Sequence, residues 1–152
     1  MAVEAEPGRI EGGEDGVADT AELAGMLTTP EEAREFADTG IDWLAPSFGN
    51  IHGKYPAGGP SLDFHLLRDI KNTVGEEVRL VLHGTDGFGE GEYGMCVRGG
   101  VSKVNVNRCV NEVFLREVRK GASLSEGIER GVVGMEEVVG EVMGWCGSVG
   151  RA

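Results

Sequence analysis

The chain has 152 residues and a mass of 16.1 kDa, which is enough for one domain with a buried core. Its 14 basic and 26 acidic residues give a net charge of −12. This surface argues against binding to nucleic acid or anionic lipid, because both need clustered lysine and arginine. Glycine is in excess, with 26 residues, but there is no collagen period and 40% of residues are hydrophobic. The chain is therefore neither fibrous nor wholly disordered.

The three cysteines, Cys96, Cys109 and Cys146, are too scattered for a disulfide framework. We expect free thiols, which are typical of a reducing compartment. No apolar run is long enough to span a bilayer, and the first residues lack the apolar segment of a secretory signal. The sequence therefore predicts a cytoplasmic protein with no membrane partner.

Short apolar segments alternate with helical patterns along the chain. The expected strands are residues 2–5, 41–48, 78–82 and 101–106. The expected helices are residues 30–38, 62–74, 90–98, 110–120 and 124–145. This alternation indicates β-α units and a parallel sheet, so the fold class is α/β.

Local signals set several of these boundaries. Thr29 can cap the first helix, Pro30 suits its first position, and Gly40 ends it. Pro46 argues that the second strand ends early or bends. The last helix contains Gly127, Gly131, Gly134, Gly140 and Gly144. Each costs about 1 kcal/mol relative to alanine in a helix interior, so they either allow close packing or leave this end marginal.

Two histidine-glycine pairs, His52-Gly53 and His83-Gly84, follow predicted strands. The carboxyl ends of parallel strands meet at one edge of a sheet, where sites are built. The two imidazoles are therefore candidate metal ligands, although the pattern alone favours two histidines that have structural partners or lie at the surface. His65 falls within a predicted helix, and we expect it at the solvent edge.

Further polar residues have two readings each. Asn105 and Asn107 close the last strand and can bind substrate oxygens or simply complete a turn. An acidic cluster near the amino terminus can bind metal or move protons, or form a solvated loop; it comprises Glu4, Glu6, Glu14 and Asp15. Neither of the common glycine-rich nucleotide motifs is present.

Taken in order, four segments resemble class II fructose-bisphosphate aldolases and related ketose-bisphosphate aldolases, especially fungal forms. The four segments are Glu4–Gly8 with Gly12–Asp15, Ser47–Gly53, Leu82–Gly84 and Val101–Asn107. They keep their order and spacing over nearly the whole chain. Four motifs in register are far more specific than any one of them.

The resemblance implies a (β/α)₈ barrel with its active site at the carboxyl ends of the strands. The four motifs would follow strands five to eight, so residues 1–152 would form the last four β-α units, a single incomplete domain. The implied reaction is retro-aldol cleavage of a ketose bisphosphate to dihydroxyacetone phosphate and glyceraldehyde 3-phosphate. A divalent metal, usually zinc, polarises the ketone.

The resemblance also implies roles for individual residues. The metal ligands would be His52, His83 and Glu6. Glu14, in the acidic loop, would take part in proton transfer, and Asn105 would act beside it. The implied substrate contacts are Gly53, Gly84, Thr85, Asp86, Asn105, Asn107 and Arg108. Backbone around Gly53 and Gly84 would also favour a monovalent cation.

The phosphate loop departs from the family pattern. Asp86 stands where the family has a small hydroxyl residue, and an anion there repels phosphate unless a cation answers it. Arg108 stands where the family often has threonine. We expect Arg108 to pair with Asp86 or to bind the phosphate itself.

The second departure from the family pattern is that the motifs of the family's amino-terminal half have no counterpart in this sequence. That half supplies a third metal histidine and an acid/base aspartate, and no His-x-Asp-His motif occurs in this chain. A complete barrel needs about 250 residues. We therefore expect weak or no activity from the isolated chain, and a homo-oligomer or a complementing amino-terminal half as partner. The alternatives are a non-catalytic half-barrel that binds metal or sugar phosphate, and an aldolase for another ketose such as tagatose bisphosphate.

Overall fold

The computed structural model describes residues 1–10 and 26–151. Glu14 and Asp15 lie outside the described residues. The chain divides into two compact units. The first unit is Met1–Thr85 with Met95–Asn105, and the second is Asp86–Gly94 with Val106–Ala152.

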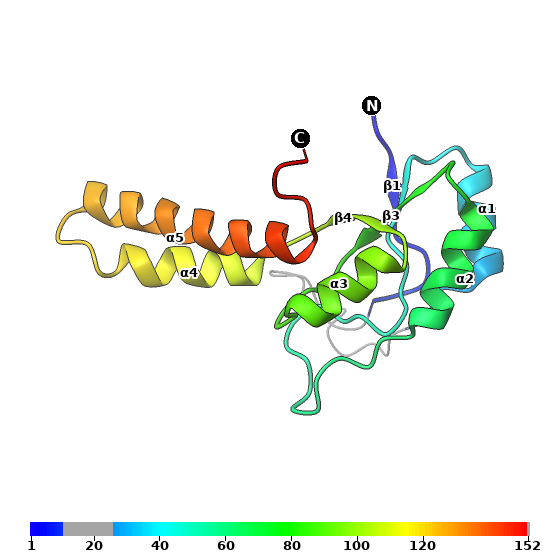
Figure 1. Ribbon diagram of the computed structural model, residues 1–152, viewed down its shortest axis with the longest axis horizontal. Coiled ribbons are helices and arrows are strands. Elements are labelled where there is room, and N and C mark those ends of the chain that lie inside the picture. The colour runs from blue at the N-terminus through cyan, green and yellow to red at the C-terminus, as the bar shows by residue number, and fades with distance from the viewer. Residues whose placement is uncertain (11–25, 152) are drawn as a thin grey trace. The chain divides into compact units, whose positions relative to one another are not determined.

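A four-stranded parallel sheet forms the centre of the first unit (Figure 1). Its strands lie in chain order, namely β1 (Glu4–Ala5), β2 (Trp43–Leu44), β3 (Arg79–Leu82) and β4 (Val101–Val104). Each neighbouring pair is parallel, which confirms the predicted β-α units. Strand β2 is much shorter than the expected 41–48, and it ends two residues before Pro46.

Two helices of the first unit pack against each other, α1 (Pro30–Asp38) and α2 (Phe64–Val74). A capping box starts α1, because the Thr29 side chain accepts from the Glu32 amide and the Glu32 carboxylate accepts from the Thr29 amide. Asp63 caps α2, because its side chain accepts from the His65 and Leu66 amides. This cap explains why the helix begins at residue 64 and not at 62.

Apolar residues of the sheet and of both helices make the core. Leu44, Leu80 and Leu82 of the strands have no exposed surface, and neither do Leu67 and Ile70 of α2. Of the apolar stripe that predicts α2, Leu67 and Ile70 are buried, while Leu62 and Leu66 are half-buried. The buried strand residues anchor the sheet in the core, and the loops that carry the candidate site begin where these strands end.

The second unit is built around a hairpin of α4 (Arg108–Val118) and α5 (Leu124–Trp145) (Figure 1). The remaining helix, α3 (Glu90–Arg98), begins in the second unit and ends in the first. Three α5 glycines face α4. A Cβ at Gly127 would lie 2.7 Å from the Val118 carbonyl oxygen, and one at Gly131 would lie 2.6 Å from the Phe114 ring. Gly134 meets Val113 in the same way, at 2.7 Å.

The other two glycines of α5 behave differently. A Cβ at Gly140 or Gly144 would meet nothing within 4 Å. Gly127, Gly131 and Gly134 therefore permit close packing of the two helices. Gly140 and Gly144 lower the stability of the helix and permit no such contact.

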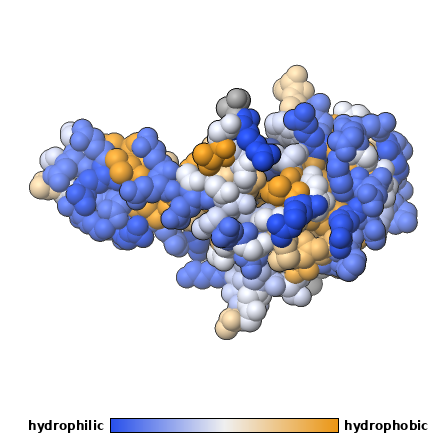
Figure 2. Space-filling view, viewed as in Figure 1, coloured by the Kyte–Doolittle hydropathy of each residue, from blue (hydrophilic) through white to orange (hydrophobic). Residues whose placement is uncertain are grey.

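Part of the hairpin surface is apolar. Figure 2 shows apolar residues on the hairpin among hydrophilic ones. The exposed apolar residues of α5 include Ile128, Val132, Val139 and Met143. Among the described residues, no helix is both long and apolar enough to cross a bilayer.

Candidate active site

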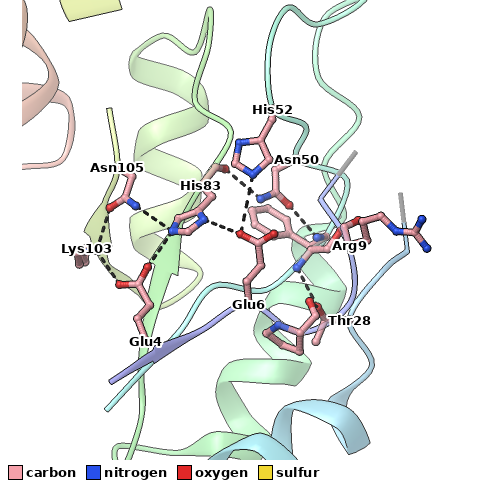
Figure 3. Close-up of polar contacts among 12 residues, drawn as sticks. Glu4, Glu6, Arg9, Thr28, Asn50, His52, His83, Lys103 and Asn105 are labelled. Atoms are coloured by element: carbon pink, nitrogen blue, oxygen red, sulfur yellow. Dashed lines mark hydrogen bonds and ion pairs between the residues drawn. The ribbon is translucent and has the colours of Figure 1, made fainter. Parts of the chain in front are cut away.

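Polar side chains gather at the carboxyl ends of the four parallel strands (Figure 3). Glu4 lies in β1 and Glu6 directly follows it, while His83 directly follows β3 and Asn105 directly follows β4. His52 comes from the loop after β2. Parallel strands bring these ends to one edge of the sheet, so residues up to 101 positions apart in the chain meet there.

His83 is the centre of the cluster. Its Nδ1 lies 2.7 Å from Glu6 Oε2, and its Nε2 lies 2.9 Å from Glu4 Oε1. Asn105 Nδ2 also lies 2.9 Å from His83 Nε2. Both ring nitrogens therefore face groups of other strands, and the imidazole plane is fixed from two sides.

His52 completes a group of three metal-binding side chains. Its Nε2 lies 3.9 Å from Glu6 Oε2, and the rings of His52 and His83 are 6.0 Å apart between centroids. Ligand atoms of Glu6, His52 and His83 all lie within 4.8 Å of one another. Two imidazoles and one carboxylate are a donor set that suits zinc, so these residues fit the divalent metal implied by the sequence.

The cluster holds strongly perturbed charges. Burial alone raises the pKa of the Glu6 carboxyl, but hydrogen bonds and charge from His52 and His83 outweigh it and lower that pKa to about 2. The hydrogen bond to Glu6 raises the pKa of His83, which burial opposes and Glu4 reinforces. Burial raises the pKa of Glu4 as well, but hydrogen bonds from Lys103 and His83 outweigh burial, so the pKa of Glu4 is lowered. The carboxylates therefore stay ionised and available as ligands at neutral pH.

Two side chains join the loops that carry the histidines. Buried Asn50 accepts from the Phe48 amide at 2.9 Å and donates to the His83 carbonyl at 3.0 Å. The Tyr55 hydroxyl accepts from the Ile51 amide at 3.0 Å and donates to the Gly84 carbonyl at 2.7 Å. The separation of the two histidines is thus set by hydrogen bonds to backbone.

Gly84 is required where these loops touch. Its φ is +69°, and a Cβ there would lie 2.4 Å from the Ile51 carbonyl oxygen. A side chain would therefore both strain the backbone and push the loops apart. Gly84, predicted from the sequence as a substrate contact, is thus also required for the packing of these two loops.

The other predicted residues have different surroundings. The Thr85 hydroxyl is tied to backbone, donating to the Asn105 carbonyl at 2.8 Å. In the second unit, Arg108 Nε donates to Asp86 Oδ2 at 2.6 Å, so the expected ion pair is present. Asn107 precedes α4 and accepts from the Asn111 side chain. His65 is exposed on α2, as expected.

Sequence reasoning missed three residues of the site. Asn50 and Tyr55 were not singled out, although both flank the predicted His52-Gly53 pair. Lys103 was seen only as part of a strand, yet its Nζ donates to Glu4 Oε2 at 2.7 Å and to Asn105 Oδ1 at 2.9 Å. The signal that could have found Lys103 is its place two residues before Asn105, on the same face of the strand.

Fold and site together define a class, an α/β protein whose parallel strands present a cluster of two histidines and a glutamate suited to a divalent metal. The family model for class II fructose-bisphosphate aldolase matches residues 1–151. The chain therefore belongs to the class II fructose-bisphosphate aldolase family.

Relatives agree with this assignment. A provisionally named fructose-bisphosphate aldolase of Coccidioides immitis is 49% identical over all of this chain and 51% of the relative. The crystal structure of a fructose-1,6-bisphosphate aldolase from that organism, also provisionally named, superposes with a TM-score of 0.93, at 49% identity, over 99% of this chain and 54% of the other. The YdjI aldolase of Escherichia coli K12 gives a TM-score of 0.76 at 28% identity, over 84% of this chain and 48% of the other.

A more distant structure shows the same fold. The fructose-bisphosphate aldolase of Campylobacter jejuni matches with a TM-score of 0.75 at 21% identity, over 100% of this chain and 53% of the other. The chain spans about half the length of the relatives it matches. The predicted partial (β/α)₈ barrel is confirmed, with four parallel strands in the part that the structure describes.

Proposed function

We propose that this chain supplies one half of the active site of a zinc-dependent aldolase, which cleaves a ketose bisphosphate to dihydroxyacetone phosphate and glyceraldehyde 3-phosphate. The observation that carries the proposal is the cluster of Glu6, His52 and His83 at the edge of the parallel sheet, in a chain that belongs to the aldolase family. We treat residues 1–152 as one incomplete domain of such a barrel, in which fructose 1,6-bisphosphate is the first substrate to test.

Each residue of the cluster has a part in the proposal. His52, His83 and Glu6 would hold the metal, which acts as a Lewis acid on the substrate carbonyl when bound. The Asn105 amide, turned toward His83, would donate to a substrate oxygen. Gly53 and Gly84 would let substrate approach the backbone, and the same backbone would favour a monovalent cation. Glu14 would serve proton transfer.

The residues proposed to bind the substrate phosphate differ most from the family pattern. Asp86 is neutralised by Arg108 in the structure, which removes the repulsion that Asp86 alone would exert on a phosphate. Thr85, Asn107 and Arg108 are the further proposed substrate contacts. A changed phosphate site favours the alternative that the natural substrate is another ketose, such as tagatose bisphosphate.

Catalysis needs groups that these motifs do not include. The family resemblance implies a third metal histidine and an acid/base aspartate, so we propose that turnover requires a complementing amino-terminal half. The second candidate function is a non-catalytic half-barrel that binds metal or sugar phosphate. The grouping of Glu6, His52 and His83 within this one chain, which could hold a metal, favours it. The scattered spacing of the three cysteines in the sequence supports a cytoplasmic location for either function.

One experiment separates the two functions. The purified chain is assayed with zinc and fructose 1,6-bisphosphate, alone and mixed with the matching amino-terminal half of the Coccidioides relative. The aldolase proposal expects turnover only in the mixture, and none with the His52→Ala variant. Zinc binding without turnover in the mixture would favour the non-catalytic protein.

A further inference from the structure

Lys103 and Glu4 form a connected support behind the metal-binding cluster. Glu4 Oε1 faces His83 Nε2 at 2.9 Å, while Glu4 Oε2 accepts from Lys103 Nζ at 2.7 Å (Figure 3). Lys103 Nζ also lies 5.0 Å above the centroid of the Trp43 ring. The ammonium group is therefore held by a carboxylate on one side and an aromatic face on another, which restricts a side chain that is otherwise flexible.

The hydrogen bonds restrict which nitrogen of His83 can bind a metal. Of the two His83 nitrogens, Nδ1 is the one beside the proposed ligand Glu6, at 2.7 Å from Glu6 Oε2. A neutral imidazole has one protonated nitrogen and one with a free lone pair. If Nδ1 offers its lone pair to a metal, Nε2 carries the hydrogen. Glu4, an acceptor at 2.9 Å, is the group that can take it.

This tautomer has a consequence for Asn105. A protonated Nε2 cannot also accept from the Asn105 amide, although the two nitrogens are 2.9 Å apart. Lysine has three donors and no acceptor, so Lys103 holds Asn105 Oδ1 toward itself at 2.9 Å. The NH₂ group of Asn105 therefore faces the site with hydrogens that His83 does not use.

We propose that Glu4, held in place by Lys103, is a positioning residue that accepts the Nε2 hydrogen of His83, so that Nδ1 beside Glu6 is the nitrogen that offers its lone pair when a metal binds. The same lysine holds the Asn105 oxygen, so that the Asn105 amide nitrogen faces the cluster. This inference rests on the proposed metal-dependent function. Glu4 and Lys103 are not among the three proposed metal ligands, so the role proposed for both is to position His83 and Asn105.

The test begins with the zinc affinity of the purified chain. Removing a carboxylate that supports a metal-binding histidine typically weakens metal affinity about 10- to 100-fold. Glu4→Gln is expected to raise the zinc Kd by that factor, and Lys103→Met to raise it less. Lys103→Met should add nothing in the Glu4→Gln background if the lysine acts through Glu4. Lys103→Arg, which keeps a donor, should restore most of the affinity.

The second unit offers matched controls. Lys120 Nζ lies 2.6 Å from Glu117 Oε1, so Glu117→Gln and Lys120→Met repeat the same changes of charge at a pair outside the cluster. These controls should leave the zinc Kd unchanged. An equal loss in the control and test variants would overturn the proposal, because it would reflect net charge and not the contact to His83.

A readout without metal separates this inference from the proposed function. Nitrogen-15 spectra of the metal-free chain should show a hydrogen-bonded Nε2–H of His83, and Glu4→Leu should abolish that signal while the backbone amide spectrum stays native. A wild-type chain that keeps the signal but binds no zinc would contradict the metal function and leave the positioning role supported. A zinc Kd and an Nε2–H signal that are both unchanged by Glu4 substitution would overturn the positioning role.

Discussion

Tyr55 gives the most direct way to test how the fold positions the metal ligands. Its hydroxyl makes two hydrogen bonds, to the Ile51 amide and to the Gly84 carbonyl, and these backbone groups adjoin His52 and His83. Tyr55→Phe removes both bonds and keeps the ring. Each hydrogen bond contributes about 1 kcal/mol net, so the loss of these two bonds weakens the ligand geometry by about 1–2 kcal/mol.

The expected result is a weaker zinc site in a folded protein. A loss of about 1–2 kcal/mol corresponds to a zinc Kd raised about 5- to 30-fold, since 1.4 kcal/mol is a factor of ten. Competition with a chromophoric chelator measures this Kd. Tyr93→Phe is the matched control, because Tyr93 lies in the second unit, where its ring packs against Phe88 and Trp145. A Tyr55→Phe chain with wild-type zinc affinity would refute the argument that the two loops are held by this phenol.

Three other predictions follow from single contacts. Gly140→Ala should stabilise the hairpin by about 0.5–1 kcal/mol, since its Cβ has open space, whereas Gly127→Ala should destabilise it by about 1–3 kcal/mol because its Cβ meets the Val118 carbonyl. Urea unfolding measures both, and equal effects would contradict the packing role. Arg108→Ala should weaken sugar-phosphate binding by leaving Asp86 unanswered, and calorimetry showing unchanged binding would end that role. The His83 network should stabilise the metal-free chain fully below about pH 6.5 and progressively less as pH rises through the raised pKa of His83. Its Glu6 part should be present above about pH 4.5 and be lost as pH falls toward 2. The stability difference between wild type and His83→Gln should follow this pH profile, and a difference that is independent of pH would contradict it.

Local chemistry made the helices predictable. The cap at Thr29, with Pro30 after it, fixed α1, and α3 and α5 have the bounds that their sequence patterns indicate. Strands were harder, because a strand's length depends on its neighbours as well as on its own residues. The apolar run around Trp43 predicts eight residues, but only two pair with both neighbouring strands.

The candidate site was likewise predictable only in part. His52 and His83 could be proposed from their places after two strands, since parallel strands bring their carboxyl ends to one edge, whereas Glu6 was implied as a ligand by the family resemblance. The supports of these residues could not be proposed, because Glu4 and Lys103 are 99 positions apart and meet only through the order of the strands. Likewise, sequence alone cannot separate Gly127 from Gly140, because only the packing of α4 against α5 makes one necessary and the other costly.

Glu6, His52 and His83 place the three proposed metal ligands within this one chain. Calorimetric titration with zinc tests this proposal most directly. The account predicts one zinc bound per chain, with binding abolished or reduced at least about 100-fold in each of His52→Ala and His83→Ala, because each removes one of three ligands. The His65→Ala control, at an exposed position on α2, should bind zinc like the wild type. Absence of saturable binding, or binding that His52→Ala and His83→Ala leave intact, would contradict the account.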